Sequence, residues 1–198
     1  MLFAEAFVTM LVILDPVGNV PVFLALTKDD DAGRRRRASL EATAVAASVI
    51  LVFAAFGQQI LQLLGISLQA LQVAGGLVLV LVALELLGST QRTGHSADVR
   101  NPALVPLGTP LLAGPGAIAA TMVYIRRADD FGEAMLVVSA IMAALAVVYV
   151  ALRSAAGLAR ILGRAGIELL TRVVGVLLAA IAVQLVAAGI DAWVRHGV

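Results

Sequence analysis

Apolar residues fill six long stretches of the chain, and polar and charged residues gather between them. The stretches cover residues 3–26, 42–64, 66–87, 104–125, 134–152 and 173–190. Each is close to the roughly 20 residues that an α-helix needs to cross the hydrocarbon core of a bilayer. The pattern predicts an all-α integral membrane protein with six transmembrane helices.

Two of these stretches, the first and the fourth, are interrupted near their middle by helix-breaking residues. The first break reads Asp15-Pro16-Val17-Gly18-Asn19-Val20-Pro21, and the second reads Pro110-Leu111-Leu112-Ala113-Gly114-Pro115-Gly116. Backbone groups released from a helix at membrane depth are tolerated only where protein or a water-filled cavity satisfies them. A pair of breaks in corresponding positions therefore predicts a solute-binding site at mid-membrane.

The two halves of the chain resemble each other at an offset near 100 residues. A shift of 99 places Pro16 on Pro115, and a shift of 100 places residues 72–75 on residues 172–175. Each half holds three spans, and an odd number makes the second half enter the membrane in the opposite orientation. We expect one transmembrane domain built from two inverted repeats, residues 1–98 and 99–198.

Composition and charge agree with a multi-pass membrane protein and orient it. The chain is 61% hydrophobic with a mean hydropathy of +1.01, well above the values of soluble domains. Eleven basic residues fall in the segments 27–41, 88–103 and 153–172, and only Arg126, Arg127 and Arg195 fall on the opposite side. The positive-inside rule makes the basic side cytoplasmic and puts both termini in the periplasm.

Two basic segments have membrane-surface interpretations. The run Arg34 to Arg37 is expected to contact anionic lipid headgroups rather than nucleic acid. Residues 154–170 alternate apolar residues with arginines, which predicts a short amphipathic helix on the cytoplasmic surface.

Several functional classes have no support in the residues. The chain has no cysteine, and its two histidines, His95 and His196, lie outside the spans. No metal-ligand spacing or nucleophile–base constellation falls within a span. We expect no enzyme activity, no cofactor and no nucleic-acid partner.

Asp15 and Asn19 are the candidate chemical groups of the first break. An ionisable side chain near the centre of a span is costly and marks a functional site by default. The alternative is that Asp15 caps the helical turn that follows it. Asn19 has the same two interpretations, since its amide could meet a zwitterionic solute or satisfy carbonyls released around Pro16 and Pro21.

Gly114, Pro115 and Gly116 are the candidate residues of the second break. Glycines on both sides of a proline permit left-handed backbone and close approach of a ligand. The N–H groups that open the next helix attract an anion such as a carboxylate. The alternative is that these glycines permit close helix packing. Gln184, deep in the last span, is expected to bind solute or to bond another helix.

These segments resemble the MarC family of bacterial inner-membrane proteins, which includes the SnatA small neutral amino acid transporters. The resemblance rests on residues 14–23, 106–118 and 175–184 and covers essentially the whole chain. Gly108 stands where most members are expected to carry alanine. Membership implies six spans, a bacterial inner-membrane location and transport of glycine or alanine.

The sequence-based hypothesis is a secondary transporter that binds a small neutral amino acid between the two broken helices. The site residues are expected to be Asp15, Pro16, Gly18, Asn19, Gly114, Pro115, Gly116 and Gln184. Asp15 suggests coupling to H⁺ or Na⁺. The alternative is a passive channel or an exporter for another small solute. Membrane lipids are expected partners, and the oligomeric state is left open.

Overall fold

The protein is all-helical in a computed structural model that describes residues 1–27, 30–88 and 112–196. Seven helices form in this part of the chain: α1 (Leu2–Leu14), α2 (Asn19–Leu26), α3 (Ala32–Leu64), α4 (Leu68–Gly88), α5 (Pro115–Arg126), α6 (Phe131–Arg153) and α7 (Ala155–His196). No strand occurs among the described residues.

Four of these elements are long and apolar enough to cross a membrane. They are α3, α4, α6 and residues Ala165–Arg195 of α7. The spans predicted at 66–87 and 134–152 correspond to α4 and α6, with ends that differ by one to three residues. The span predicted at 42–64 begins ten residues earlier, because the arginine run is helical and Asp31 caps it through a 2.8 Å bond from the Arg34 N–H.

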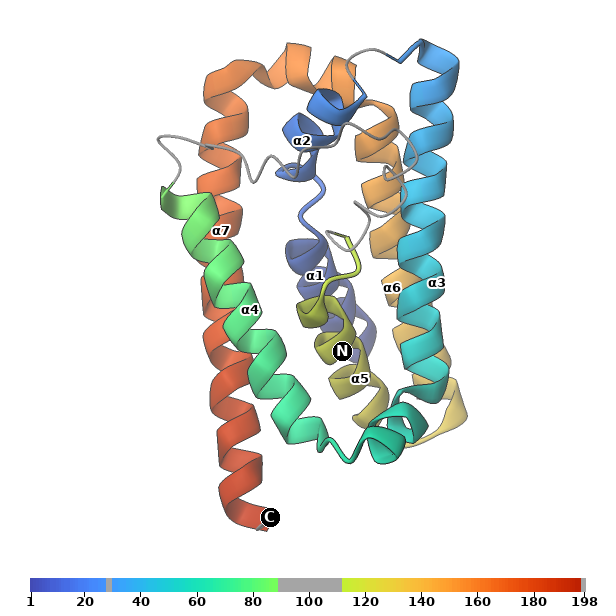
Figure 1. Cartoon of the computed structure of the whole chain (residues 1–198), viewed down its shortest axis with the longest axis vertical. Helices are drawn as coiled ribbons and strands as arrows, with labels where there is room; N and C mark the ends of the chain where they lie inside the picture. Colours follow the sequence, from blue (N-terminus) through green and yellow to red (C-terminus); the bar gives the residue numbers. More distant parts are fainter. Residues whose placement is uncertain (28–29, 89–111, 197–198) are drawn as a thin grey trace.

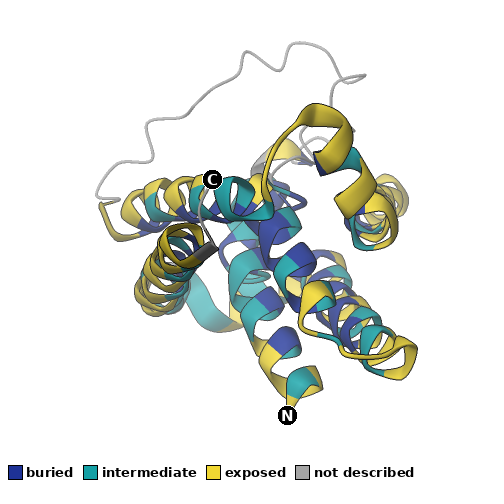
Figure 2. Ribbon diagram, turned by 90° about the horizontal axis from the view of Figure 1, so that it is seen from below, coloured by how far each residue is buried: buried dark blue, intermediate teal, exposed yellow. Residues whose placement is uncertain are grey.

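The short helices lie at the centre of the molecule between two pairs of long ones (Figure 1). α4 and α7 pack against each other on one side, and α3 and α6 pack on the other. α1 ends, and α5 begins, in the middle of the molecule, while α2 continues from α1 toward the opposite end (Figure 1). Buried residues concentrate where these central helices meet, and exposed residues line the outer sides (Figure 2).

The helix break predicted within residues 3–26 is present, but it is shorter than predicted, and α1 is too short to count among the four candidate spans. Helix α1 ends at Leu14 and α2 begins at Asn19, so only residues 15–18 lie outside a helix. Pro21 is the third residue of α2, where a proline removes no helical hydrogen bond because the first N–H groups of a helix have no acceptor.

The second broken span is described only in part. Helix α5 begins at Pro115, as the break at Gly114-Pro115-Gly116 predicts, whereas the predicted first half of this span, Pro110 and Leu111 lie outside the described residues.

The amphipathic segment predicted at 154–170 is helical but shorter. Gly163 has a left-handed φ of 61° and interrupts α7. Residues before Gly163 turn across one end of the molecule, and the rest of α7 runs back along α4 (Figure 1). Residues 164–170 therefore belong to the long helix rather than to the surface segment.

Candidate functional site

Asp15 stands at the end of α1 in a strained backbone conformation. It is the only non-glycine residue with positive φ among the described residues, with φ 40° and ψ 69°. Its side chain is 7% exposed. Left-handed geometry costs an L-residue roughly 1–2 kcal/mol, and Asp and Asn tolerate it best because they bond locally. A buried, strained carboxylate in mid-span is a reason to look for function there.

The carboxylate of Asp15 also caps the turn that leads into α2. The Gly18 N–H donates to Asp15 Oδ1 at 2.8 Å, and the Asn19 N–H donates to the Asp15 carbonyl at 3.1 Å. A Cβ on Gly18 would lie 1.8 Å from Asp15 Oδ2, so the carboxylate occupies the space that a side chain would need. Gly18 is therefore required for room rather than for its φ, which is an ordinary −64°.

The Asn19 side chain bonds two backbone carbonyls at the end of α1. Its Nδ2 donates to the Leu14 carbonyl at 2.8 Å and to the Asp15 carbonyl at 3.0 Å. Of the two interpretations of Asn19, the geometry matches the one in which the amide satisfies carbonyls released by the break.

Two further carbonyls at the end of α1 have no donor among the described residues. The Val12 carbonyl would accept from residue 16 in a continuous helix, but Pro16 has no N–H. The Ile13 carbonyl would accept from Val17, and no such bond forms. The sequence predicts released carbonyls around Pro16 without identifying their residues, and the i to i+4 rule applied at Pro16 identifies the first of these two. They give the C-terminal end of α1 a cation-attracting character.

The start of helix α5 has the opposite polarity to the end of α1, because it offers N–H donors instead of carbonyl acceptors. Gly114 is its extended N-cap, with φ −67° and ψ 169°, and Pro115 is its first residue. The next N–H groups, of Gly116 and Ala117, find no acceptor among the described residues, whereas the Ile118 N–H bonds the Gly114 carbonyl at 3.2 Å. Such N–H groups together with the helix dipole attract an anion.

The two polar helix ends come together in the middle of the molecule. α1 contacts α5, and one buried apolar cluster contains Leu14 and Val20 beside the first break and Leu112, Ala113 and Ala117 beside the second. The end of α1, with its acceptors, and the start of α5, with its donors, therefore lie near the same buried cluster.

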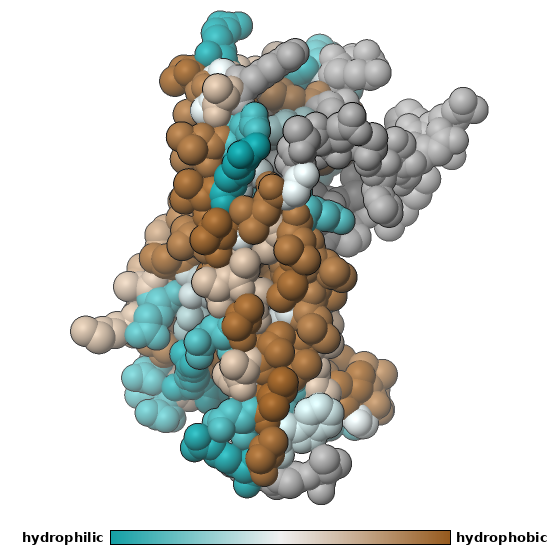
Figure 3. Space-filling model, turned by 90° about the vertical axis from the view of Figure 1, so that its left-hand side faces the viewer, coloured by the Kyte–Doolittle hydropathy of each residue, from teal (hydrophilic) through white to brown (hydrophobic). Residues whose placement is uncertain are grey.

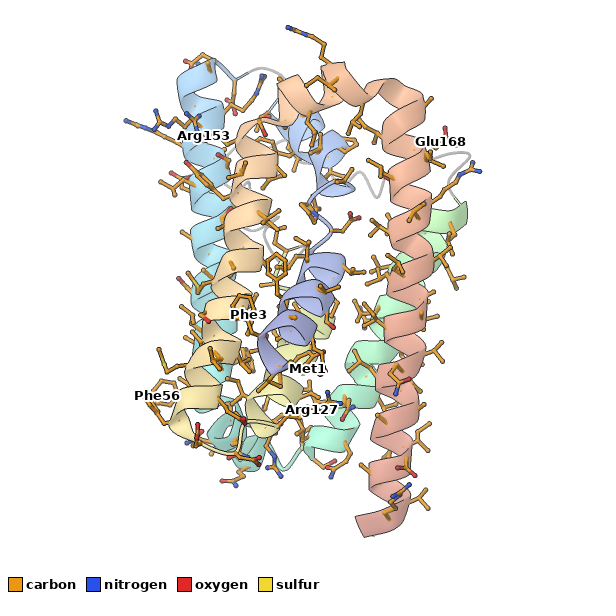
Figure 4. The ribbon with its side chains drawn as sticks, turned by 180° about the vertical axis from the view of Figure 1, so that it is seen from behind. Met1, Phe3, Phe56, Arg127, Arg153 and Glu168 are labelled. Carbon is orange, nitrogen blue, oxygen red and sulfur yellow. The ribbon has the colours of Figure 1, made fainter. Side chains whose placement is uncertain are left out.

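Away from the two breaks, side-chain contacts join α1 to α5 and to the residue that follows it. Thr9 Oγ1 and the Tyr124 hydroxyl lie 2.9 Å apart, and Arg127 stacks over the Tyr124 ring at 5.4 Å while lying 3.9 Å from Glu5. Figure 4 shows Arg127 beside Met1, at the end of the molecule opposite Arg153. These contacts fix α5 against α1 and set the spacing of the two polar ends.

The glycines of the second break do not have the expected geometry. Neither Gly114 nor Gly116 is left-handed, since Gly65 and Gly163 are the positive-φ glycines among the described residues. A Cβ on Gly116 would lie 2.4 Å from Leu79 Cγ, so its α-carbon faces α4 rather than open space. Gly116 therefore packs α5 on α4, while its N–H remains at the helix end.

Gln184 does not join these residues. Its side chain is exposed on α7, while its neighbours Ala182 and Leu185 are buried in the cluster between α4 and α7. The expectation that it contributes to a site between the breaks does not match this placement.

The chain is similar to known proteins over nearly its whole length. A family model described as MarC family integral membrane protein matches residues 1–194. A UPF0056 membrane protein of Methanocaldococcus jannaschii is 40% identical, covering 95% of each chain. A UPF0056 membrane protein of Archaeoglobus fulgidus is 35% identical, covering 95% of this chain and 92% of the relative. The UPF0056 inner membrane protein YhgN of Escherichia coli is 30% identical, covering 96% and 97%. No solved structure matches the chain.

Proposed function

Because the chain belongs to the MarC family of integral membrane proteins, we propose that it is a secondary transporter of small neutral amino acids such as glycine and alanine. The observation that carries the proposal is that two helix ends of opposite polarity lie near each other in the middle of the molecule. The solute carboxylate would accept from the N–H groups of Gly116 and Ala117, and its ammonium would donate to the Val12 and Ile13 carbonyls and to Asp15.

The chemistry of these groups favours a zwitterion over an ion of one sign. A simple anion would be attracted to the start of α5 but repelled by the Asp15 carboxylate. A simple cation would be attracted to the Asp15 carboxylate but repelled by the start of α5. A glycine or alanine molecule matches both ends with one short backbone. Transporters that use broken helices commonly bind substrate carboxylates at half-helix N-termini and ions at unwound carbonyls.

An inverted repeat would explain how the two ends come to face each other. Exchanging the halves of the chain maps α3 onto α6 and α4 onto α7, and it maps the broken first span onto the span that contains α5. The contact of α5 with α3 then matches that of α2 with α6, and the contact of α5 with α4 matches that of α2 with α7. This agreement supports two inverted three-helix repeats, whose relative rocking would expose the site to each side in turn.

The proposed location is the bacterial inner membrane, with both termini in the periplasm. The Escherichia coli relative is described as an inner membrane protein. The exposed arginines Arg36, Arg37 and Arg153 lie toward the end formed by the start of α3 and the end of α6, which the positive-inside rule assigns to the cytoplasm. Reporter fusions at the C-terminus test this orientation, and a cytoplasmic C-terminus would overturn it.

Flux into proteoliposomes tests the transporter itself. Radiolabelled glycine and alanine should enter with saturating kinetics and show counterflow, and an imposed H⁺ or Na⁺ gradient should drive accumulation. A flux that does not saturate and shows no counterflow would instead indicate the passive channel.

A further inference from the structure

Gln184 is an exposed amide within Ala165–Arg195, the part of α7 that is long and apolar enough to cross a membrane, where lipid would offer it no hydrogen bond. It lies 12 residues after Arg172 and 7 residues before Asp191, about 18 Å and about 10 Å along the helix axis at a rise of about 1.5 Å per residue. No described residue bonds it, and its side chain is exposed. An unsatisfied amide in hydrocarbon is costly, so a partner is expected.

Other exposed polar side chains of the long helices can satisfy their hydrogen bonds in ways that Gln184 cannot. Gln58, Gln59 and Gln62 lie in the last two turns of α3, and Glu85 lies one turn from the end of α4, so both groups can reach toward the interface. Ser48, in the middle of α3, donates to the Ala44 carbonyl at 2.8 Å. Gln184 is thus distinguished by depth and by the lack of a bond within its own helix.

We propose that a second copy of this chain covers this face of α7, so that Gln184 of one protomer bonds Gln184 of its partner. The proposal is independent of the transport activity. An amide is self-complementary, because each one carries both donors and an acceptor. A two-fold axis along the membrane normal places the same residue of two copies at the same depth, whatever the tilt of the helix.

The residues around Gln184 fit a helix–helix seam. Exposed residues follow the 4-3-4-3-4 spacing of a heptad seam along α7, with small alanines on both sides of the amide: Val173, Leu177, Ala180, Gln184, Ala187 and Asp191. Small residues let two helices approach closely enough for an interhelical hydrogen bond. A single polar residue in such a seam fixes its register.

Charge at the end of the seam does not oppose pairing. Asp191 accepts a 2.9 Å bond from Arg195 Nε of its own helix, so two copies of Asp191 would meet already neutralised. Toward the other end, Arg172 is paired in the same way with Glu168. Figure 3, which looks onto the side of α4 and α7, shows that hydrophobic side chains cover much of the middle of this face.

Disulfide cross-linking in the native membrane tests the seam, and the absence of natural cysteines makes a single introduced thiol unambiguous. Ala187→Cys should give a covalent dimer on mild oxidation. Leu81→Cys, on the exposed face of α4, is the matched control and should stay monomeric. Equal cross-linking of the two variants would overturn the proposal.

The role of the amide is tested by energy transfer between labelled copies in proteoliposomes of increasing lipid content. Gln184→Leu should raise the dissociation constant of the dimer roughly three- to tenfold, as expected for loss of one interhelical hydrogen bond, and Gln184→Asn should recover part of the affinity. Gln59→Leu removes an exposed glutamine near the helix end and should change nothing. Unchanged association in Gln184→Leu would contradict the proposal. If solute affinity is lost while association stays intact, Gln184 binds solute instead.

Discussion

Replacement of Asp15 by Asn and by Ala should separate the capping role of this residue from its role in transport. Both variants remove the charge. Asn keeps an oxygen that can accept from the Gly18 N–H at the observed 2.8 Å, and it tolerates the observed φ of 40°. Alanine keeps neither property. The two variants therefore have the same charge at position 15 but differ in their ability to cap the turn.

The expected cost of each replacement follows from these contacts. Loss of a cap costs about 0.5–2 kcal/mol, and an alanine in left-handed backbone adds roughly 1–2 kcal/mol. Asp15→Ala should therefore lower the free energy of unfolding by about 1.5–4 kcal/mol. Asp15→Asn weakens one bond by about 1 kcal/mol through loss of its charge, and relief from burying a charge offsets part of that.

The measurements are thermal unfolding in detergent and counterflow of glycine in proteoliposomes. We expect Asp15→Asn to keep nearly normal stability but to lose flux or its dependence on the ion gradient, and Asp15→Ala to lose both stability and flux. If Asp15→Asn transports with unchanged rate and ion dependence, Asp15 is only a cap. If it unfolds as readily as Asp15→Ala, the capping geometry described above is wrong.

Three further predictions concern neighbouring and peripheral positions. Gly18→Ala should displace the Asp15 carboxylate from the residue-18 N–H, because the new Cβ would lie 1.8 Å from Asp15 Oδ2. This variant should therefore impair counterflow as Asp15→Asn does. Normal counterflow would show that this carboxylate position is dispensable. Gly116→Ala and Gly75→Ala should each lower thermal stability more than Gly175→Ala, by about 1–3 kcal/mol of overpacking. The reason is that the added Cβ would lie 2.4 Å and 2.6 Å from its nearest neighbour at positions 116 and 75, but 3.1 Å at position 175. The reverse order in a melting series would refute the α4–α5 packing. The Arg34 N–H bond lowers the pKa of Asp31 below its ordinary value of 3.8, so the cap of α3 should be fully present above pH 3.8 and weaken as the pH falls through the lowered value. Asp31→Asn should abolish this pH dependence of the protection factors of the first-turn amides, and an unchanged dependence would assign it to another group.

The spans and the first break could be predicted from the sequence because both depend on local properties. Long apolar runs fix α4 and α6, and proline with glycine at 16 and 18 stops α1. The start of α3 was missed because hydropathy alone ends a span at its charges, whereas Asp31 and the arginines extend the helix beyond the bilayer core.

Orientation of side chains was the part that sequence could not give. Gly116 has the composition of a ligand-binding turn, yet its α-carbon faces Leu79, a contact between helices 37 residues apart in the chain. Gln184 is deep in its span, but depth does not say which side of α7 it occupies; that follows from Ala182 and Leu185 packing into the cluster with α4. Which released carbonyls keep no donor also depends on orientation, since the Asn19 amide bonds those of Leu14 and Asp15 and no described residue donates to those of Val12 and Ile13.

The central claim is that the ends of α1 and α5 together hold a small amino acid, and binding of unlabelled solutes to the purified protein tests it most directly. Isothermal titration of the intact protein should show saturable binding of glycine and alanine, with no binding of acetate or methylamine, which each match only one of the two helix ends. Asp15→Asn should weaken glycine binding without lowering the melting temperature appreciably. Binding of acetate or methylamine as tight as that of glycine, or glycine binding unaffected by Asp15→Asn, would contradict the account.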